Sequence, residues 1–204
     1  MGRYLLALDP SVRSPGFALF RDGVLERAQR TIVKSSSTAV QNGSQLGPSE
    51  FSRWQYVAQV ITDQLPDVIH TVVFELPQIY TWGKGKGDPN QLLALAGIGA
   101  IVAAHYKTFT LSPRPAEWIG QVPKSTKGSA LSSPRALKIL SRLSVDERTL
   151  VPDSHDAIDA VGLGLWALQR LAPKKVLTSG SGTPTTPGTH TTPRTRTRPR
   201  SRVP

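Results

Sequence analysis

The chain has 204 residues, which is enough to bury one sizeable core but too few for two large lobes. It contains no cysteine, which excludes disulfides and thiolate zinc sites and is compatible with a cytoplasmic protein, or a host-cytoplasmic one if a phage encodes it. Its 25 Lys and Arg against 14 Asp and Glu give a formal net charge of +11, which favours a polyanionic partner.

The N-terminal part of the chain predicts three consecutive strands. Tyr4 to Leu8 is a compact apolar run that places Asp9 at its C-terminal end, and residues 16–20 continue the strand pattern. Asp22-Gly23 is a hairpin turn signal, after which residues 24–33 predict the third strand. The run before Asp9 is short, so we expect no secretory signal peptide.

A loop and a helix are predicted next. Residues 34–48 are rich in Ser, Gly, Asn and Gln, which is typical of a surface loop. Ser49 can cap a helix that Pro66 ends. Its apolar residues recur at spacings of three and four and predict one buried stripe, formed by Phe51, Trp54, Ala58, Ile61 and Leu65.

Two further strands surround the longest apolar stretch. Val68 to Phe74 is a β-branched run that places Glu75 at its C-terminal end, and residues 108–111 predict a short final strand. Between them, Asp88-Pro89 is a good start for a helix that runs to about Tyr106. Because its apolar core, residues 92–104, is too short to span a bilayer comfortably, we expect a buried helix and no membrane association.

The C-terminal part predicts helices and then a tail. Residues 113–120 favour a short turn of helix and residues 121–132 a polar, basic loop, after which Ser133-Pro134 opens a helix to Leu143. The last helix begins near Asp153 or Ser154 and runs to about residue 171. Its predicted core side is formed by Ile158, Val161, Leu165 and Leu168.

The sequence therefore predicts two regions. Residues 1–173 form a domain of the α/β class, a mixed sheet flanked by helices. Residues 174–204 form a Thr/Pro/Arg-rich tail that carries +7 of the net charge and has little to bury, so we expect it to be disordered.

Four acids stand where this fold could bring them together. Asp9 and Glu75 follow two predicted strands, and Asp156 and Asp159 share one face of the last helix. Carboxylates from separate elements are what a pair of Mg²⁺ or Mn²⁺ ions requires for phosphodiester hydrolysis. Each acid taken alone is more often an ordinary strand-end, helix-start or solvated residue, so the prediction rests on their joint placement.

The sequence resembles the RuvC family of Holliday junction resolvases, in particular phage-type and divergent members, over about the first 170 residues. The resemblance rests on the helix after Asp88 and on three motifs: LLALDPSVRSPGFALF (5–20), VVFELP (72–77) and SHDAIDAVGLGLWAL (154–168).

The resemblance implies an RNase H-like fold with a five-stranded mixed sheet, and a nuclease domain over residues 1–173. It implies a crossover junction endodeoxyribonuclease that acts as a homodimer on branched double-stranded DNA, with two Mg²⁺ or Mn²⁺ ions in each active site. The implied catalytic and metal-binding residues are Asp9, Glu75, Asp156 and Asp159.

The chain departs from the family pattern at two positions. Bacterial members of the family usually have Gly after the Asp-Pro pair, where this chain has Ser11. Many place an aromatic wedge three residues after the glutamate, where this chain has Gln78, with Tyr80 and Trp82 slightly later. Ser11 bears on how closely this turn approaches the metals, and the missing wedge bears on junction specificity more than on nuclease chemistry.

Aromatic and basic side chains indicate candidate DNA contacts. Aromatic rings with nearby cations suit unpaired bases at a branch, and basic side chains beside the metals suit phosphates; an ordinary flexible loop and a solvated basic face are the alternatives. The candidate DNA-binding residues are Tyr80, Trp82, Lys84, Lys86, Lys124, Lys127, Arg135 and Lys138. His155 could assist proton transfer or contact phosphate, although a partly exposed helix-start histidine is the commoner arrangement.

Three other functions share some of these features. An RNase H-fold nuclease acting on flaps, forks or RNA–DNA hybrids would use the same carboxylates. A non-catalytic branched-DNA-binding protein could retain the fold without the chemistry. An actin-like ATPase or sugar kinase also begins with a strand leading to Asp, but it needs two lobes, which this length does not supply.

Overall fold

The computed structural model describes residues 2–33, 50–77, 89–120, 122 and 128–171. The predicted loop at 34–48, part of the predicted basic loop at 121–132 and the predicted tail therefore lie outside the described residues. Among the described residues, no helix is both long enough and apolar enough to cross a membrane.

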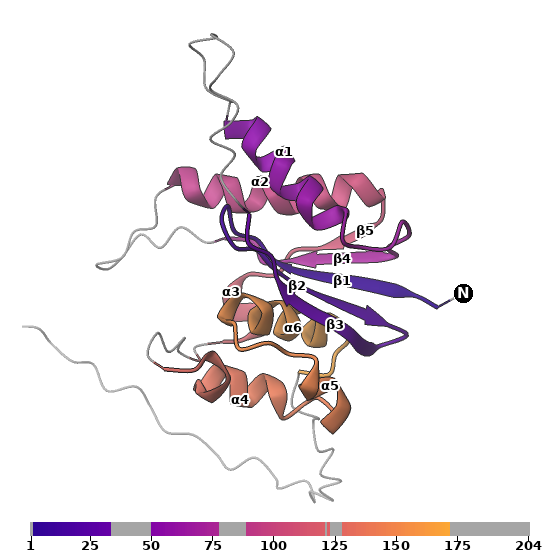
Figure 1. Cartoon of the computed structure of the whole chain (residues 1–204), viewed down its shortest axis with the longest axis vertical. Helices are drawn as coiled ribbons and strands as arrows, with labels where there is room; N and C mark the ends of the chain where they lie inside the picture. The colour runs from indigo at the N-terminus through magenta and orange to yellow at the C-terminus, as the bar shows by residue number, and fades with distance from the viewer. Residues whose placement is uncertain (1, 34–49, 78–88, 121, 123–127, 172–204) are drawn as a thin grey trace, which may run out of the picture. The chain divides into compact units, whose positions relative to one another are not determined.

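Five strands form one mixed sheet in the order β3-β2-β1-β4-β5 (Figure 1). The central strand β1 pairs antiparallel with β2 and parallel with β4, while β3 and β5 lie at the edges. The strands span Tyr4–Asp9 (β1), Gly16–Arg21 (β2), Val24–Arg30 (β3), Thr71–Phe74 (β4) and Phe109–Leu111 (β5). The predicted RNase H-like, five-stranded mixed sheet is confirmed.

Helices cover both faces of this sheet, with α1 and α2 on one side and α3 to α6 on the other (Figure 1). The α-helices span Glu50–Thr62 (α1), Pro89–Tyr106 (α2), Pro115–Trp118 (α3), Pro134–Leu140 (α4), Val145–Thr149 (α5) and His155–Ala167 (α6). A 3-10 helix, η2, spans Ala130–Ser132 inside the segment predicted as loop.

The alternation of side chains along β1 explains the two layers. Leu6 and Leu8 point to one face, where they pack with Ile61 of α1 and Ile98 of α2. Ala7 points to the other face, toward α6. Because that side chain is small, α6 can approach the sheet closely.

Glycines allow α6 to pack deep in the molecule. A Cβ atom at Gly164 would lie 2.0 Å from Phe20 of β2, and one at Gly162 would lie 2.6 Å from Trp118 of α3. Residues 157–165 are all buried, so the helix is enclosed on every side rather than along the one predicted stripe. The consequence is that the second half of the helix lies close against β2 and α3.

Several predicted boundaries extend too far. Strand β3 ends at Arg30 rather than at residue 33, because β2 begins at Gly16 and the amides of Thr31 and Val33 donate to carbonyls of the segment between β1 and β2. Likewise β4 begins at Thr71, whose register partner Leu5 lies near the start of β1. Helices α1, α4 and α6 end a few residues before their predicted limits. After α1 and α4 the following amides donate in tighter turns than those of an α-helix, and after α6 the amides of Arg170 and Leu171 both donate back to the carbonyl of Leu165.

One predicted core residue is wrong and one helix was not predicted. Phe51 is 53% exposed, because it lies in the first turn of α1, where it contacts the ring of Trp54 edge-on at 6.1 Å. Helix α5 begins with a capping box between Ser144 and Glu147. The Ser-x-x-Glu spacing was a signal for that helix in the sequence.

Candidate functional site

Asp9 and Glu75 lie side by side at the edge of the sheet formed by the C-terminal ends of β1 and β4, which is distinct from the edge strands β3 and β5. In the parallel pair β1–β4, Leu8 is in register with Phe74, and each acid directly follows one of these two residues in the chain. Both acids are partly buried. The Oε2 atom of Glu75 accepts a hydrogen bond of 2.8 Å from the Nε1 of Trp118.

Asp156 comes to the same edge through the start of α6. Asp9 is in register with Gly16 on β2, and a Cβ atom on Gly16 would lie 2.1 Å from the backbone oxygen of Asp156. Only glycine therefore lets the first turn of α6 lie so close to Asp9. The Oδ2 atom of Asp156 accepts a 3.2 Å hydrogen bond from the Ser14 hydroxyl and lies 3.5 Å from the Nε of Arg30.

Asp159, one turn further along α6, is 5% exposed and is paired with Arg135 of α4. The Nη1 atom of Arg135 lies 3.0 Å from Oδ2 of Asp159, and its Nη2 donates to the carbonyl of Val122 at 3.0 Å. The same guanidinium lies 5.8 Å from the centre of the Trp118 ring. One chain of contacts therefore runs from Glu75 through Trp118 and Arg135 to Asp159.

The chemistry of these side chains suits a hard divalent cation, since all four supply carboxylate oxygens. In the described part of the chain, however, no three Asp, Glu or His side chains are placed so that they could hold a metal ion together. Two of the four carboxylates are paired with arginines instead. Carboxylate oxygens fit Mg²⁺ in their chemistry, and a site shared by the four acids would require Asp156 and Asp159 to exchange those arginines for the cation.

A cavity of about 360 Å³ lies beside Asp156. Its lining includes Arg30, His155 and Asp153. The Ser129 hydroxyl and the Leu131 amide donate to Asp153, and the hydrogen bond from Ser129 is the main cause that holds the pKa of this carboxyl below its usual value. Asp153 therefore acts as a structural tie to the segment before α4.

The predicted DNA-binding residues are described only in part. The Arg135 side chain is 17% exposed and engaged with Asp159, whereas Lys138 is exposed, with its Nζ 3.5 Å from the carbonyl of Ile119. Their contact with phosphate stays a prediction. The other predicted residues lie outside the described residues: Tyr80, Trp82, Lys84, Lys86, Lys124 and Lys127.

Sequence reasoning named Arg135, the partner of Asp159, but missed the other neighbours of the acids. Ser14, Arg30 and Trp118 contact Asp156 or Glu75 from elements that are distant in sequence. Ser14 lies within residues 5–20, the motif that carries the family resemblance and contains Asp9. For Ser14, this position in the sequence was the one indication that it lies near the acids. The spacing of Arg30 and Trp118 relative to the acids carries no such information.

No protein-family model matches the chain, and no curated protein matches its sequence. Among solved structures, it is similar to Thermus thermophilus RuvC in complex with a Holliday junction substrate, with a TM-score of 0.51 and 14% identity over 82% of this chain and 96% of that one. A second Thermus thermophilus RuvC structure matches with a TM-score of 0.48 and 12% identity over 79% and 91% of the two chains. The first match shows that the chain has a RuvC-like fold, as the sequence resemblance implied.

Proposed function

We propose, from the premise of a RuvC-like fold, that the chain is a metal-dependent endodeoxyribonuclease that resolves Holliday junctions or other branched DNA by paired nicks. The observation that carries this proposal is the convergence of acids at one sheet edge. Asp9 and Glu75 end neighbouring parallel strands, and Gly16 admits the start of α6, with Asp156, against Asp9.

The proposed cofactor is Mg²⁺, with Mn²⁺ as a substitute and two ions in each active site. The residues that would hold it are Asp9, Glu75, Asp156 and Asp159. Bound there, Mg²⁺ would activate water and stabilise the charge that develops on the scissile phosphate. Among the chain's own side chains, Trp118 would orient Glu75. Arg135 and Arg30 balance the charge of Asp159 and Asp156 in the metal-free chain and would give way to the cation.

Branched DNA is the substrate class that the comparison favours. The similar Thermus thermophilus protein was solved in complex with a Holliday junction, and the positive net charge suits a polyanion. A homodimer would place two active sites on a twofold-symmetric junction, one for each nick. Light scattering of the purified chain, alone and with a junction, tests this stoichiometry.

The Asp9→Asn variant tests the nuclease proposal. We expect the wild-type chain to cut an immobile four-way junction in Mg²⁺ or Mn²⁺ but not with a chelator. The variant loses one carboxylate charge at the centre of the site, so cutting should fall by about two orders of magnitude or more while junction binding persists. Cleavage that survives either the substitution or the chelator would contradict the proposal.

A panel of junction, fork, flap and RNA–DNA hybrid distinguishes the substrates. Paired symmetric nicks in the junction support a resolvase, whereas preference for another member supports the broader RNase H-fold nuclease. The arginine pairs of Asp156 and Asp159 favour one further candidate, a non-catalytic branched-DNA-binding protein. Tight junction binding without cutting in any metal would favour that candidate.

A further inference from the structure

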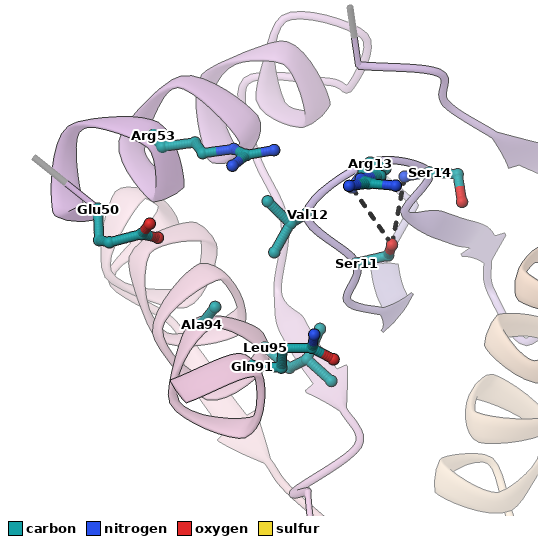
Figure 2. Close-up of a pocket in the computed structure, with 9 residues that line it drawn as sticks. All are labelled: Ser11, Val12, Arg13, Ser14, Glu50, Arg53, Gln91, Ala94 and Leu95. Atoms are coloured by element: carbon teal, nitrogen blue, oxygen red, sulfur yellow. Dashed lines mark hydrogen bonds between the residues drawn. The ribbon is translucent and has the colours of Figure 1, made fainter. Parts of the chain in front are cut away.

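A larger cavity, of about 550 Å³, lies on the α1/α2 side of the segment between β1 and β2. Residues 11–14 of that segment, here called the β1–β2 turn, form one wall, and residues near the starts of α1 and α2 form the other (Figure 2). Its described lining includes none of the four acids and none of the predicted DNA-binding residues. The cavity therefore needs an explanation of its own.

The cavity is lined by more positive than negative charge. Arg13 lines it from the turn and Arg53 from α1, and the Arg53 side chain points from its helix toward the turn (Figure 2). The single acid in the described lining is Glu50. Within the part of the chain that the structure describes, neither guanidinium forms an ion pair, so both are available to an anionic ligand.

The turn that carries Arg13 is held in place before any ligand binds. The Ser11 hydroxyl accepts hydrogen bonds from the amides of Arg13 and Ser14, at 3.4 and 3.2 Å. The amide of Val33 donates to the carbonyl of Arg13 at 2.9 Å. A ligand in the cavity would therefore meet a preorganised backbone, which lowers the entropic cost of binding.

The same turn has a second face that touches the candidate active site. Ser14, which also lines the cavity, donates its hydroxyl to Asp156 at 3.2 Å, and the turn directly follows Asp9-Pro10. A DNA strand with a phosphate at the carboxylates would therefore have its next nucleotide close to the cavity.

We infer that this cavity binds the nucleotide that flanks the scissile phosphate. Arg13 and Arg53 would hold its phosphate, while the apolar side chains of Val12 and Leu95 in the lining would contact the deoxyribose. Naming the ligand as part of the cut strand rests on the proposed function. The lining of the cavity taken alone supports a narrower inference, which is that the cavity binds a nucleoside phosphate.

Thymidine 3′,5′-bisphosphate is a suitable probe, used in EDTA so that the carboxylates hold no metal. An NMR titration compares the wild-type chain with three variants. The double variant Arg13→Gln/Arg53→Gln removes both cations, and Gln91→Trp fills the cavity without changing charge. The control is Arg3→Gln, which removes one exposed arginine just before β1, at the end opposite Asp9.

We expect the wild-type chain and R3Q to bind the probe alike, and the double variant and Q91W to bind about tenfold more weakly. All four should melt at similar temperatures, because the substituted side chains are exposed. The inference would be overturned if the double variant bound the probe as tightly as R3Q does. It would also be overturned if none of the four proteins bound the probe.

The same proteins separate this inference from the proposed function. If the double variant and Q91W lose the probe but the wild-type chain cuts no DNA in the substrate panel, the nucleotide site stands and the nuclease proposal falls. If the wild-type chain cuts a junction and all four proteins bind the probe alike, the nuclease proposal stands and this assignment falls.

Discussion

The pairing of Arg135 with Asp159 opposes metal binding at the candidate site. The guanidinium lies 3.0 Å from a carboxylate of a residue that is 5% exposed, so a cation that binds Asp159 must displace or share this partner. We expect Arg135→Gln to cost about 2 to 4 kcal/mol of stability in EDTA, because a buried charge loses its counterion. We expect the same variant to bind Mg²⁺ about tenfold more tightly, since the competing cation is gone.

Calorimetric titration with Mg²⁺ and thermal melts in EDTA measure both effects. Lys138→Gln is the matched control, since Lys138 is an exposed cation on the same helix, and its Nζ lies near the carbonyl of Ile119. A loss of stability without any gain in Mg²⁺ affinity would mean that Arg135 only supports the fold.

Trp118 is a positioning residue for Glu75. Its Nε1 donates to Oε2 of Glu75 at 2.8 Å, and the residue is 3% exposed. Trp118→Phe removes the donor and keeps an aromatic ring, so we expect the Mg²⁺ concentration that gives half-maximal cleavage to rise by roughly tenfold. Trp166→Phe, at a partly buried tryptophan of the same core, controls for the smaller ring and should leave the Mg²⁺ requirement unchanged.

The positions of Asp9 and Glu75 at the ends of two strands were predictable from the sequence, while the hydrogen bonds of Arg135 and Trp118 to the acids were not. Asp9 and Glu75 each stand at the end of an apolar run. Such an acid is conspicuous in the sequence, because burial of the strand in the core does not require it. Arg135 and Trp118 reach the acids through tertiary contacts across 24 and 43 positions of sequence. No periodicity connects residues so far apart, so only the packed structure reveals these contacts.

At the scale of elements, one ion pair fastens α5 to the sheet and to the segment after α6. Glu147 is 4% exposed and accepts two hydrogen bonds of 2.9 Å from Arg170, one on each oxygen, and one from the amide of Leu25 on β3. The bonds from Arg170 are the largest cause that lowers the pKa of Glu147 from 4.5 to about 2. The ionised carboxylate is therefore much preferred in the folded state.

This shift predicts an acid-sensitive contribution to stability. Because the folded-state pKa lies below the unfolded one, the contribution is fully present above pH 4.5 and is lost as pH falls toward about 2. It amounts to about 3 kcal/mol. Urea titrations between about pH 7 and pH 2.5 should show that Glu147→Gln is less stable at neutral pH and loses less stability on acidification.

Glu26→Gln provides the reference, since Glu26 is an exposed acid on β3. It should follow the wild-type dependence on pH. If the free energy of unfolding of E147Q also fell with pH in parallel with that of the wild-type chain, Glu147 would not be the source of the effect.

Element types followed from periodicity, but their ends did not. The compact apolar run of β1 and the turn at Asp22-Gly23 predicted the strands at the start of the chain, because both patterns are local. The limits of β3 and β4 depend on where their partner strands begin, which is a property of the register. The burial of α6 on all sides likewise depends on the layers around it, since an apolar stripe predicts only one contact face.

At the scale of the whole chain, positive charge is spread unevenly along the sequence. Residues 174–204 carry +7 of the net +11 and no acid, and all four candidate carboxylates precede them. We propose that residues 1–173 supply the site and that residues 174–204 add affinity that does not depend on DNA sequence. Phosphate neutralisation by Arg and Lys makes such affinity fall steeply with salt.

Truncation after Pro173 tests this division. We expect the shortened chain to bind a four-way junction more weakly. The slope of log affinity against log salt concentration should become flatter, by about one for each phosphate that the tail neutralises in the full chain. Its rate of cutting at saturating protein should remain close to that of the full chain, because the four acids are intact.

Fluorescence anisotropy at several salt concentrations, in a chelator, measures this slope without cleavage of the junction. A full-length variant with the five tail arginines changed to glutamine should reproduce the effect of truncation, since charge rather than length is the proposed cause. An unchanged slope in both proteins would assign the affinity to residues 1–173 alone, because neutralised phosphates set the salt dependence wherever the cations lie in the chain.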